Sequence, residues 1–258
     1  MSYAAELSEA LVSEFEQAIV ELDKLLLTIV SAGSSLPDGR SREHLTQGAG
    51  RRMGIIRHCL RTVFLKFPPS LSAPLSREDL YDVQIAHHAF VVNLYGYFEN
   101  LAWSFISRHN LESKIGGKKK IGLFLKSTQT FLPEPIKAYL SSPTITKWHS
   151  DYLKNYRDAL AHRIPLYIPP SVLTKDEVIH AQTLQEQERN AILERRWELL
   201  DDLREQQLAL GKPCLFFAHS FDDNEDPRPI YLHPQIICDV KTVLDFTPIY
   251  LRHWHGRA

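Results

Sequence analysis

The sequence has few of the features that mark secreted, membrane-spanning or zinc-binding proteins. Its three cysteines lie far apart and form no CxxC pair, so neither a disulfide framework nor a zinc site is indicated. Apolar runs are short, and none approaches the roughly 18 residues that a membrane-spanning helix needs. The first residues are acidic and lack the basic and apolar regions of a signal peptide. We therefore expect a cytoplasmic protein that does not contact a membrane.

An excess of charge of either sign is also missing. The chain has 30 Lys and Arg residues against 31 Asp and Glu residues, which gives a formal net charge of −1. Proteins that coat nucleic acid without sequence preference are usually basic overall, so this class is disfavoured, although a local basic groove is compatible with the composition. The apolar content of 44% and the charged content of 24% are those of a folded globular protein.

Helical patterns dominate the first half of the chain. From Leu11 to Ile29 the apolar residues recur at spacings of three and four, which predicts a helix with one apolar face. A second helix is expected over residues 41–67, loosened around the glycines at 48–50. A third begins at Ser76, an N-cap residue followed by acids that suit the positive end of a helix. Its apolar continuation to about residue 109 should be the most buried helix of the fold.

The second half mixes helices with a short hairpin. Ser142 and Pro143 predict the start of a helix that ends near Arg163. The sequence TKDE, from Thr174 to Glu177, is typical of a capping box and predicts one long charged helix that reaches about Leu210. The remaining elements expected are two strands within 214–221 and 228–233, joined by the polar turn at 222–227, and a last helix over 234–254.

These patterns together predict a mainly α protein. We expect an up-and-down helical bundle with an N-terminal helix and a C-terminal extension made of a helix, a β-hairpin and a final helix. The expected boundaries place the N-terminal helix and linker in 1–40, the bundle in 41–170 and the extension in 171–258.

The segment NYRDALAH, residues 155–162, holds the strongest candidate for a site. The spacing of Arg157 and His162 is a weak signal by itself, because with 12 histidines in 258 residues any arginine has about a 5% chance of a histidine five places on. Asp158 and His162 are four residues apart on a helix, so they can hydrogen-bond, and Asn155 lies on the same face one turn earlier. A histidine held in this way beside a guanidinium can move a proton next to a bound phosphate.

Helix geometry limits what this pair can do within one chain. Five residues at about 100° each leave the side chains of Arg157 and His162 roughly 140° apart around the helix. A single helix therefore does not aim both side chains at one atom, whereas two symmetry-related helices could line a shared cleft.

YRDALAH resembles the R-[N/D/H]-x-x-x-H motif of the HEPN superfamily, which comprises compact helical bundles in toxins, abortive-infection systems and RNA-cleaving effectors. The resemblance covers about residues 41–170, and the helix containing YGYFENLAW is similar to the apolar second core helix of such bundles. It implies a metal-independent endoribonuclease without a cofactor, formed across a two-fold homodimer, with Arg157, Asp158 and His162 in the motif positions. RNA would be the substrate, and an antitoxin or defence protein a partner. Ile164 replaces the tyrosine that some antitoxins modify, which disfavours that form of control.

The expected reaction is attack of an RNA 2′-hydroxyl on its own phosphate. His162 would transfer the proton, Arg157 would hold the phosphate oxygens and Asp158 would orient His162. Asn155 and Glu99 are supporting candidates, and surface exposure is the simpler explanation of Glu99. No carboxylate cluster suited to magnesium stands out, so no metal is expected.

The role of one basic segment and an alternative to an enzyme stay open. The run Lys118, Lys119 and Lys120 could follow an RNA backbone through phosphate contacts, or it could be an ordinary solvated loop. The alternative to an enzyme is a non-catalytic helical module that binds a partner protein or a nucleotide-like ligand.

Overall fold

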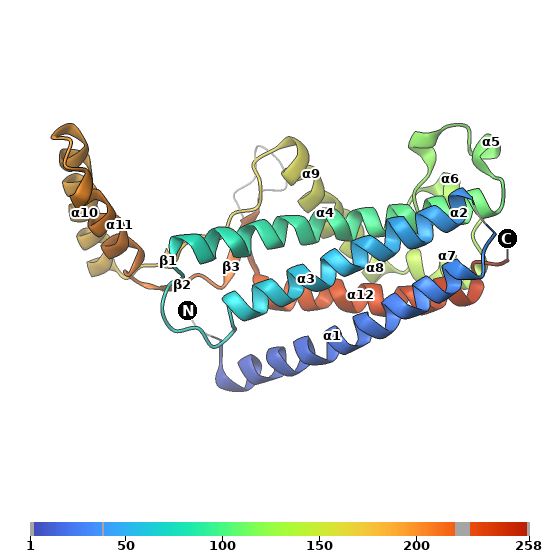
Figure 1. Cartoon of the computed structure of the whole chain (residues 1–258), viewed down its shortest axis with the longest axis horizontal. Coiled ribbons are helices and arrows are strands. Elements are labelled where there is room, and N and C mark those ends of the chain that lie inside the picture. Colours follow the sequence, from blue (N-terminus) through green and yellow to red (C-terminus); the bar gives the residue numbers. More distant parts are fainter. Residues whose placement is uncertain (1–2, 38, 220–227, 257–258) are drawn as a thin grey trace.

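Long helices with one apolar face build the body of the protein, which a computed structural model describes for residues 3–37, 39–219 and 228–256. Figure 1 shows the longest of them running side by side, and they are α1 (Ala5–Ser34), α3 (Arg51–Lys66), α4 (Arg77–Arg108) and α12 (Leu232–His253). Their buried faces contribute to one hydrophobic core. The prediction of a mainly α fold is confirmed.

α4 is buried along most of its length, as its apolar sequence predicts. Some hydroxyl groups of this core find partners across the bundle. The Tyr97 and Thr247 hydroxyl oxygens lie 2.7 Å apart, and Tyr250 on α12 donates to the carbonyl of Leu101 at 2.9 Å. These hydrogen bonds join α4 to α12 and satisfy the polar groups that form them.

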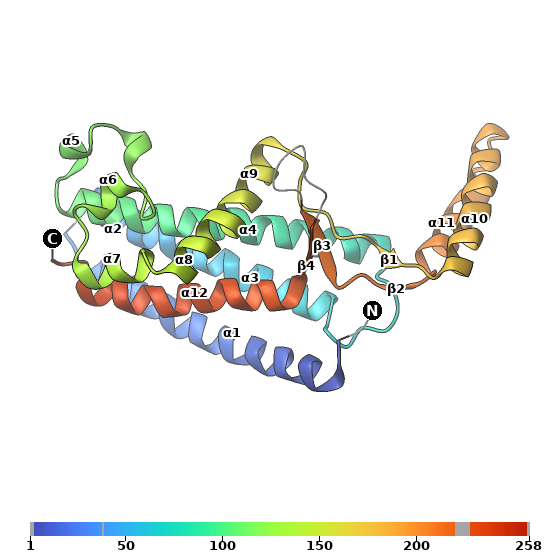
Figure 2. The ribbon, with the colours of Figure 1, turned by 180° about the vertical axis from the view of Figure 1, so that it is seen from behind.

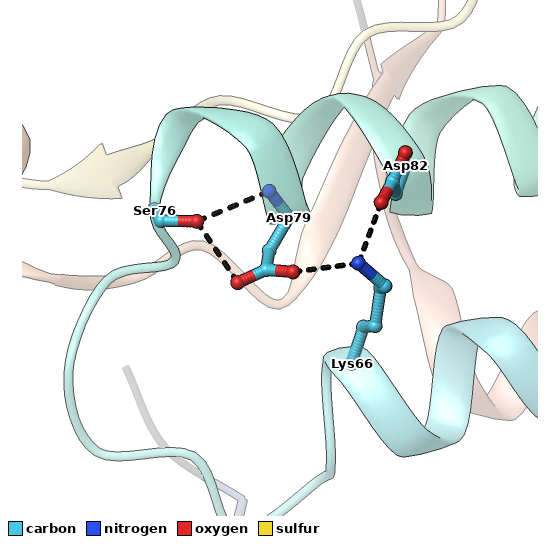
Figure 3. Close-up of polar contacts among 4 residues, drawn as sticks. All are labelled: Lys66, Ser76, Asp79 and Asp82. Atoms are coloured by element: carbon cyan, nitrogen blue, oxygen red, sulfur yellow. Dashed lines mark hydrogen bonds and ion pairs between the residues drawn. The ribbon is translucent and has the colours of Figure 1, made fainter.

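The start of α4 is fixed by side chains, as Figure 3 shows. Ser76 accepts a hydrogen bond from the Asp79 backbone N–H at 3.1 Å and donates to the Asp79 carboxylate at 2.9 Å. Lys66, in the last turn of α3, lies 2.7 Å from Asp79 and 2.5 Å from Asp82. The acids lie near the positive N-terminal end of α4, and Lys66 lies at the negative C-terminal end of α3. The charges therefore also suit the helix dipoles. These contacts hold together the two helix ends that the loop between α3 and α4 connects.

The expected loosening near residues 48–50 takes the form of a π-helical segment. α2 (Arg40–Glu43), η1 (His44–Gly50) and α3 follow one another without a break. A Cβ at Gly48 would lie 2.6 Å from Cγ of Asn100, so the absence of a side chain allows this close approach to α4. Asn100 in turn accepts a hydrogen bond from Nε of Arg52 at 2.8 Å.

The helix predicted to follow Ser142 is present in three continuous pieces. They are α8 (Pro143–Lys147), η3 (Trp148–Leu153), which is π-helical, and α9 (Lys154–His162). Ser142 stands directly before the helix, but its side chain makes no capping hydrogen bond. Trp148 anchors the segment, because its Nε1 donates to the buried carboxylate of Asp239 on α12 at 2.8 Å.

The prediction of one long helix from Thr174 to Leu210 is wrong. The chain forms two helices, α10 (Lys175–Leu193) and α11 (Trp197–Leu208), and it turns between them where Arg195 has φ of 56°. The turn brings apolar residues of the two helices together in a small core of their own that a straight helix would leave in water: Leu184, Ala191, Leu200 and Leu203. The capping box of Thr174 and Glu177 is confirmed.

This helical hairpin, named here the arm, projects from one end of the bundle (Figures 1 and 2). Its two ends are held together by the antiparallel pair of β1 (Ser171–Val172) and β2 (Lys212–Pro213). The predicted β-hairpin is confirmed as β3 (Phe216–His219) paired with β4 (Arg228–Tyr231), while its turn at 222–227 lies outside the described residues.

α1 and α12 share the main core with α3 and α4. The expected boundaries at residues 40 and 170 stay a prediction. Short elements cover the end of the bundle opposite the arm: α5 (Glu112–Ile115), η2 (Lys118–Lys120), α6 (Lys126–Gln129) and α7 (Glu134–Leu140). Within the part of the chain that the structure describes, no helix combines the length and apolar character needed to cross a bilayer.

Replacing the cap of α4 should weaken the fold measurably. Ser76→Ala removes the acceptor of the Asp79 N–H, so we expect the free energy of unfolding to fall by about 1 kcal/mol. Urea denaturation followed by circular dichroism measures the change, with Ser70→Ala in the same loop as the control, because Ser70 is exposed. A Ser76→Ala protein as stable as the Ser70→Ala protein would contradict the capping role.

Candidate functional site

Arg157 lies on the side of α9 that packs against α4. Its guanidinium carbon is 4.2 Å from the centroid of the Tyr95 ring, and its Nη1 is 2.8 Å from the Asp158 carboxylate. The side chain is 29% exposed, and its buried Nε has no hydrogen-bond partner in the structure. The guanidinium is thus held against an aromatic face, with part of it open to solvent and one donor unused.

Asp158 does not contact His162 as expected. Its carboxylate pairs with Arg157 on one oxygen and with Nζ of Lys154, at 3.3 Å, on the other. Two cations compete for this carboxylate, and they are nearer than the imidazole. The structure therefore places Asp158 as a partner of Arg157 and not as the group that orients His162.

His162 is exposed in the last turn of α9. No described residue forms a hydrogen bond or an ion pair with its ring. Arg157 faces α4 while His162 faces solvent, as the 140° separation leads one to expect. One chain therefore does not bring Arg157 and His162 together. Asn155 is occupied within the helix, where its amide donates to the Asp151 carbonyl at 3.2 Å.

Glu99, a residue for which exposure was the simpler explanation, is half-buried on α4 one turn after Tyr95. A Cβ at Gly122 would lie 3.0 Å from Oε1 of Glu99, so this glycine leaves room for the carboxyl group. Burial raises the pKa of Glu99 to about 7, and the positive charge of Arg157 opposes this rise. The structure thus brings Glu99 within electrostatic range of Arg157, as the supporting role requires.

His149 is a site residue that the sequence reasoning missed. Its ring stacks on Phe124 with the centroids 3.7 Å apart and the planes 8° from parallel, and it lies 6.1 Å from the Tyr95 ring. Burial, followed by the positive charges of Lys154 and Arg157, lowers the pKa of His149 to about 4. The imidazole is therefore neutral at pH 7. Its spacing of eight residues from Arg157, about two helical turns, is the one sequence signal that could have indicated it.

These residues form what is named here the α4–α9 cluster: Tyr95, Glu99, His149, Arg157 and Asp158. It combines a partly exposed guanidinium, a carboxyl group that titrates near neutral pH and a neutral imidazole. Groups of this kind can bind an anion and transfer a proton next to it.

The basic segment lies at the edge of this cluster. Lys118, Lys119 and Lys120 form the short helix η2 and are all exposed. Soon after them, Gly122 contacts Glu99 and Phe124 stacks on His149. The lysine run is therefore connected to the α4–α9 cluster by a few residues of chain.

Comparison with known proteins does not assign the chain to a family. No protein-family model, curated protein or solved structure matches the chain. Among the described residues, no three His, Cys, Asp or Glu side chains gather in a way that could hold a metal ion.

Neutralising Glu99 should change stability in one pH range only. Its pKa in the folded protein is about 7 against an ordinary 4.5, so the stability it contributes is present below pH 4.5 and is lost as the pH rises through 7. Glu99→Gln, which imitates the protonated form, should raise the melting temperature at pH 8 and change it little at pH 5. Glu9→Gln, at an exposed position of α1, is the control. A lower melting temperature at pH 8 would mean that Glu99 acts as a stabilising ion-pair partner instead.

Proposed function

We propose that the protein is a metal-independent endoribonuclease of the HEPN type, acting in the cytoplasm in a toxin or anti-phage defence role. The observation that carries the proposal is the placement of Arg157. Its guanidinium is fixed over Tyr95, remains partly exposed and has Glu99 and His149 nearby. A fixed and accessible guanidinium suits the phosphate of an RNA chain.

In the proposed reaction the 2′-oxygen forms a bond to phosphorus while the bond to the 5′-oxygen breaks. The products are a 2′,3′-cyclic phosphate and a 5′-hydroxyl end. Arg157 holds the phosphate oxygens, and His162 transfers the proton that leaves the 2′-hydroxyl to the departing 5′-oxygen. Lys118, Lys119 and Lys120 lie along the adjoining RNA backbone.

The site is proposed to be composite because one chain separates Arg157 from His162. In a two-fold dimer, His162 of one protomer, which is exposed and without a partner among the described residues, would face Arg157 of the other. Before RNA binds, Asp158 keeps the guanidinium oriented. An antitoxin or defence protein would act by covering this face.

Loss of either motif residue should abolish RNA cleavage. Arg157→Ala and His162→Ala should each lower the cleavage rate by about 10²-fold or more in the presence of a chelator. The measurement is cleavage of a labelled RNA, with identification of the cyclic phosphate end. Arg61→Ala, which removes an exposed arginine from α3, is the matched control. Full activity of the His162→Ala protein would refute the assignment.

Mixing the two inactive variants tests the composite site. If the site joins Arg157 of one chain to His162 of the other, half of the dimers from co-expression hold one intact site of two. We therefore expect about a quarter of the parent activity. Co-expressed protein as inactive as each variant alone would contradict a site shared in this way.

A non-catalytic role is the second candidate, and the arm favours it. Ile192, Leu193 and Trp197 at the tip of the arm are 43%, 71% and 61% exposed. Neighbouring exposed apolar side chains mark interaction surfaces. If the protein has this non-catalytic role, any growth arrest that its expression causes would be the same for the His162→Ala variant. A stable complex with a partner protein would also form.

A further inference from the structure

A basic pocket of about 640 Å³ lies at the end of the bundle opposite the arm. It is formed where the chain leaves α1, where α4 ends and where α12 ends. Its polar lining includes Arg40, Ser41, Ser107, Arg108, Glu112 and His255. The volume is within the range of about 300–1,000 Å³ that is usual for small-ligand sites.

Arg108 is positioned before any ligand arrives. Its guanidinium carbon is 4.8 Å from the Trp254 ring, and its Nη2 lies 2.5 Å from Nδ1 of His255. Because a guanidinium only donates hydrogen bonds, Nδ1 must accept, and a neutral His255 then carries its proton on Nε2. This contact leaves the Nε2–H of His255 as a further donor.

The rest of the lining also favours an anion. Arg40 is 62% exposed and reaches Glu112 only at 3.6 Å, a weak ion pair. Ser107 donates to the same carboxylate at 3.2 Å. Two arginines and a histidine thus line a space whose described lining contains a single carboxylate. This set of donors matches the oxygens of a phosphate group.

The pocket is separate from the α4–α9 cluster. Arg108 follows Glu99 by nine residues on the same helix, which corresponds to about 14 Å along its axis. Leu36 and Pro37 add an apolar wall that suits the part of a ligand away from its phosphate.

We propose that this pocket binds the terminal phosphate of a phosphorylated ligand. The phosphate could belong to a free nucleotide or to the 5′-end of an RNA, since the same donors recognise both. The site does not depend on the proposed nuclease reaction, because none of its residues belongs to the α4–α9 cluster.

Isothermal titration of the full chain tests the proposal. The probes are inorganic pyrophosphate, adenosine triphosphate, and one short oligoribonucleotide with either a 5′-phosphate or a 5′-hydroxyl. We expect saturable binding of at least one phosphorylated probe and weaker binding at higher salt. Preference for adenosine triphosphate identifies a free nucleotide as the source, and preference for the 5′-phosphorylated RNA over its 5′-hydroxyl form identifies an RNA end.

Substitutions of the basic residues and of the acidic residue in the pocket should change the binding affinity in opposite directions. Arg40→Gln and His255→Phe should each weaken binding by about tenfold, since the first removes a positive charge and the second removes a hydrogen-bond donor. Glu112→Gln should tighten binding by about threefold, because it removes the carboxylate that opposes the anion. Arg252→Gln, on an exposed residue of α12 at the same end, should leave binding unchanged.

Three results would overturn the proposal. The first is the absence of saturable binding to all probes. The second is an Arg252→Gln effect as large as that of Arg40→Gln, which would mean a general charge effect. The third is equal binding of the two RNA forms with no binding of pyrophosphate or nucleotide. Because Arg40 is largely exposed and its ion pair with Glu112 is weak, its variant should keep the melting temperature of the parent, which the same samples check.

Discussion

Burial of α4 is the constraint on which the rest of the structure depends. Its apolar residues pack against α3 and α12, and α1 contributes to the same core. Each fully buried large apolar side chain contributes about 1.5–3 kcal/mol, which makes the packing around α4 the main source of stability. The side of α4 that the core does not use carries Tyr95 and Glu99, and α9 lies against it. The same helix therefore builds the core and positions the candidate site.

Features set by neighbouring residues could be predicted from the sequence. Ser76 and Thr174 cap their helices as expected, because a cap needs only residues within three or four positions. The break between α10 and α11 was missed, since the turn contains Arg195 with a positive φ and neither glycine nor proline marks it. Contact between the apolar faces of the two helices determines that turn, and such contacts are not local.

The residues of the candidate site also fall into those that the sequence could indicate and those that depend on contacts between distant residues. Arg157 and Glu99 could be selected as polar residues of two core helices, and the angle between Arg157 and His162 followed from helix geometry. His149 has only its spacing from Arg157 to indicate it in the sequence, because its role comes from stacking on Phe124, a residue 25 positions earlier. The preference of Asp158 for Arg157 also depends on side-chain conformations that spacing alone does not determine.

The ion pair between Arg157 and Asp158 does not prevent Arg157 from binding a phosphate. If the guanidinium turns toward a phosphate oxygen, Asp158 keeps a cation, because Lys154 lies 3.3 Å from its other carboxylate oxygen. A carboxylate left without any partner would oppose this exchange, and Lys154 removes that cost. Glu99 opposes an anion less than an ordinary carboxylate does, because burial raises its pKa to about 7. The charges around Arg157 are therefore arranged so that an anion can replace Asp158 without leaving a charge unpaired.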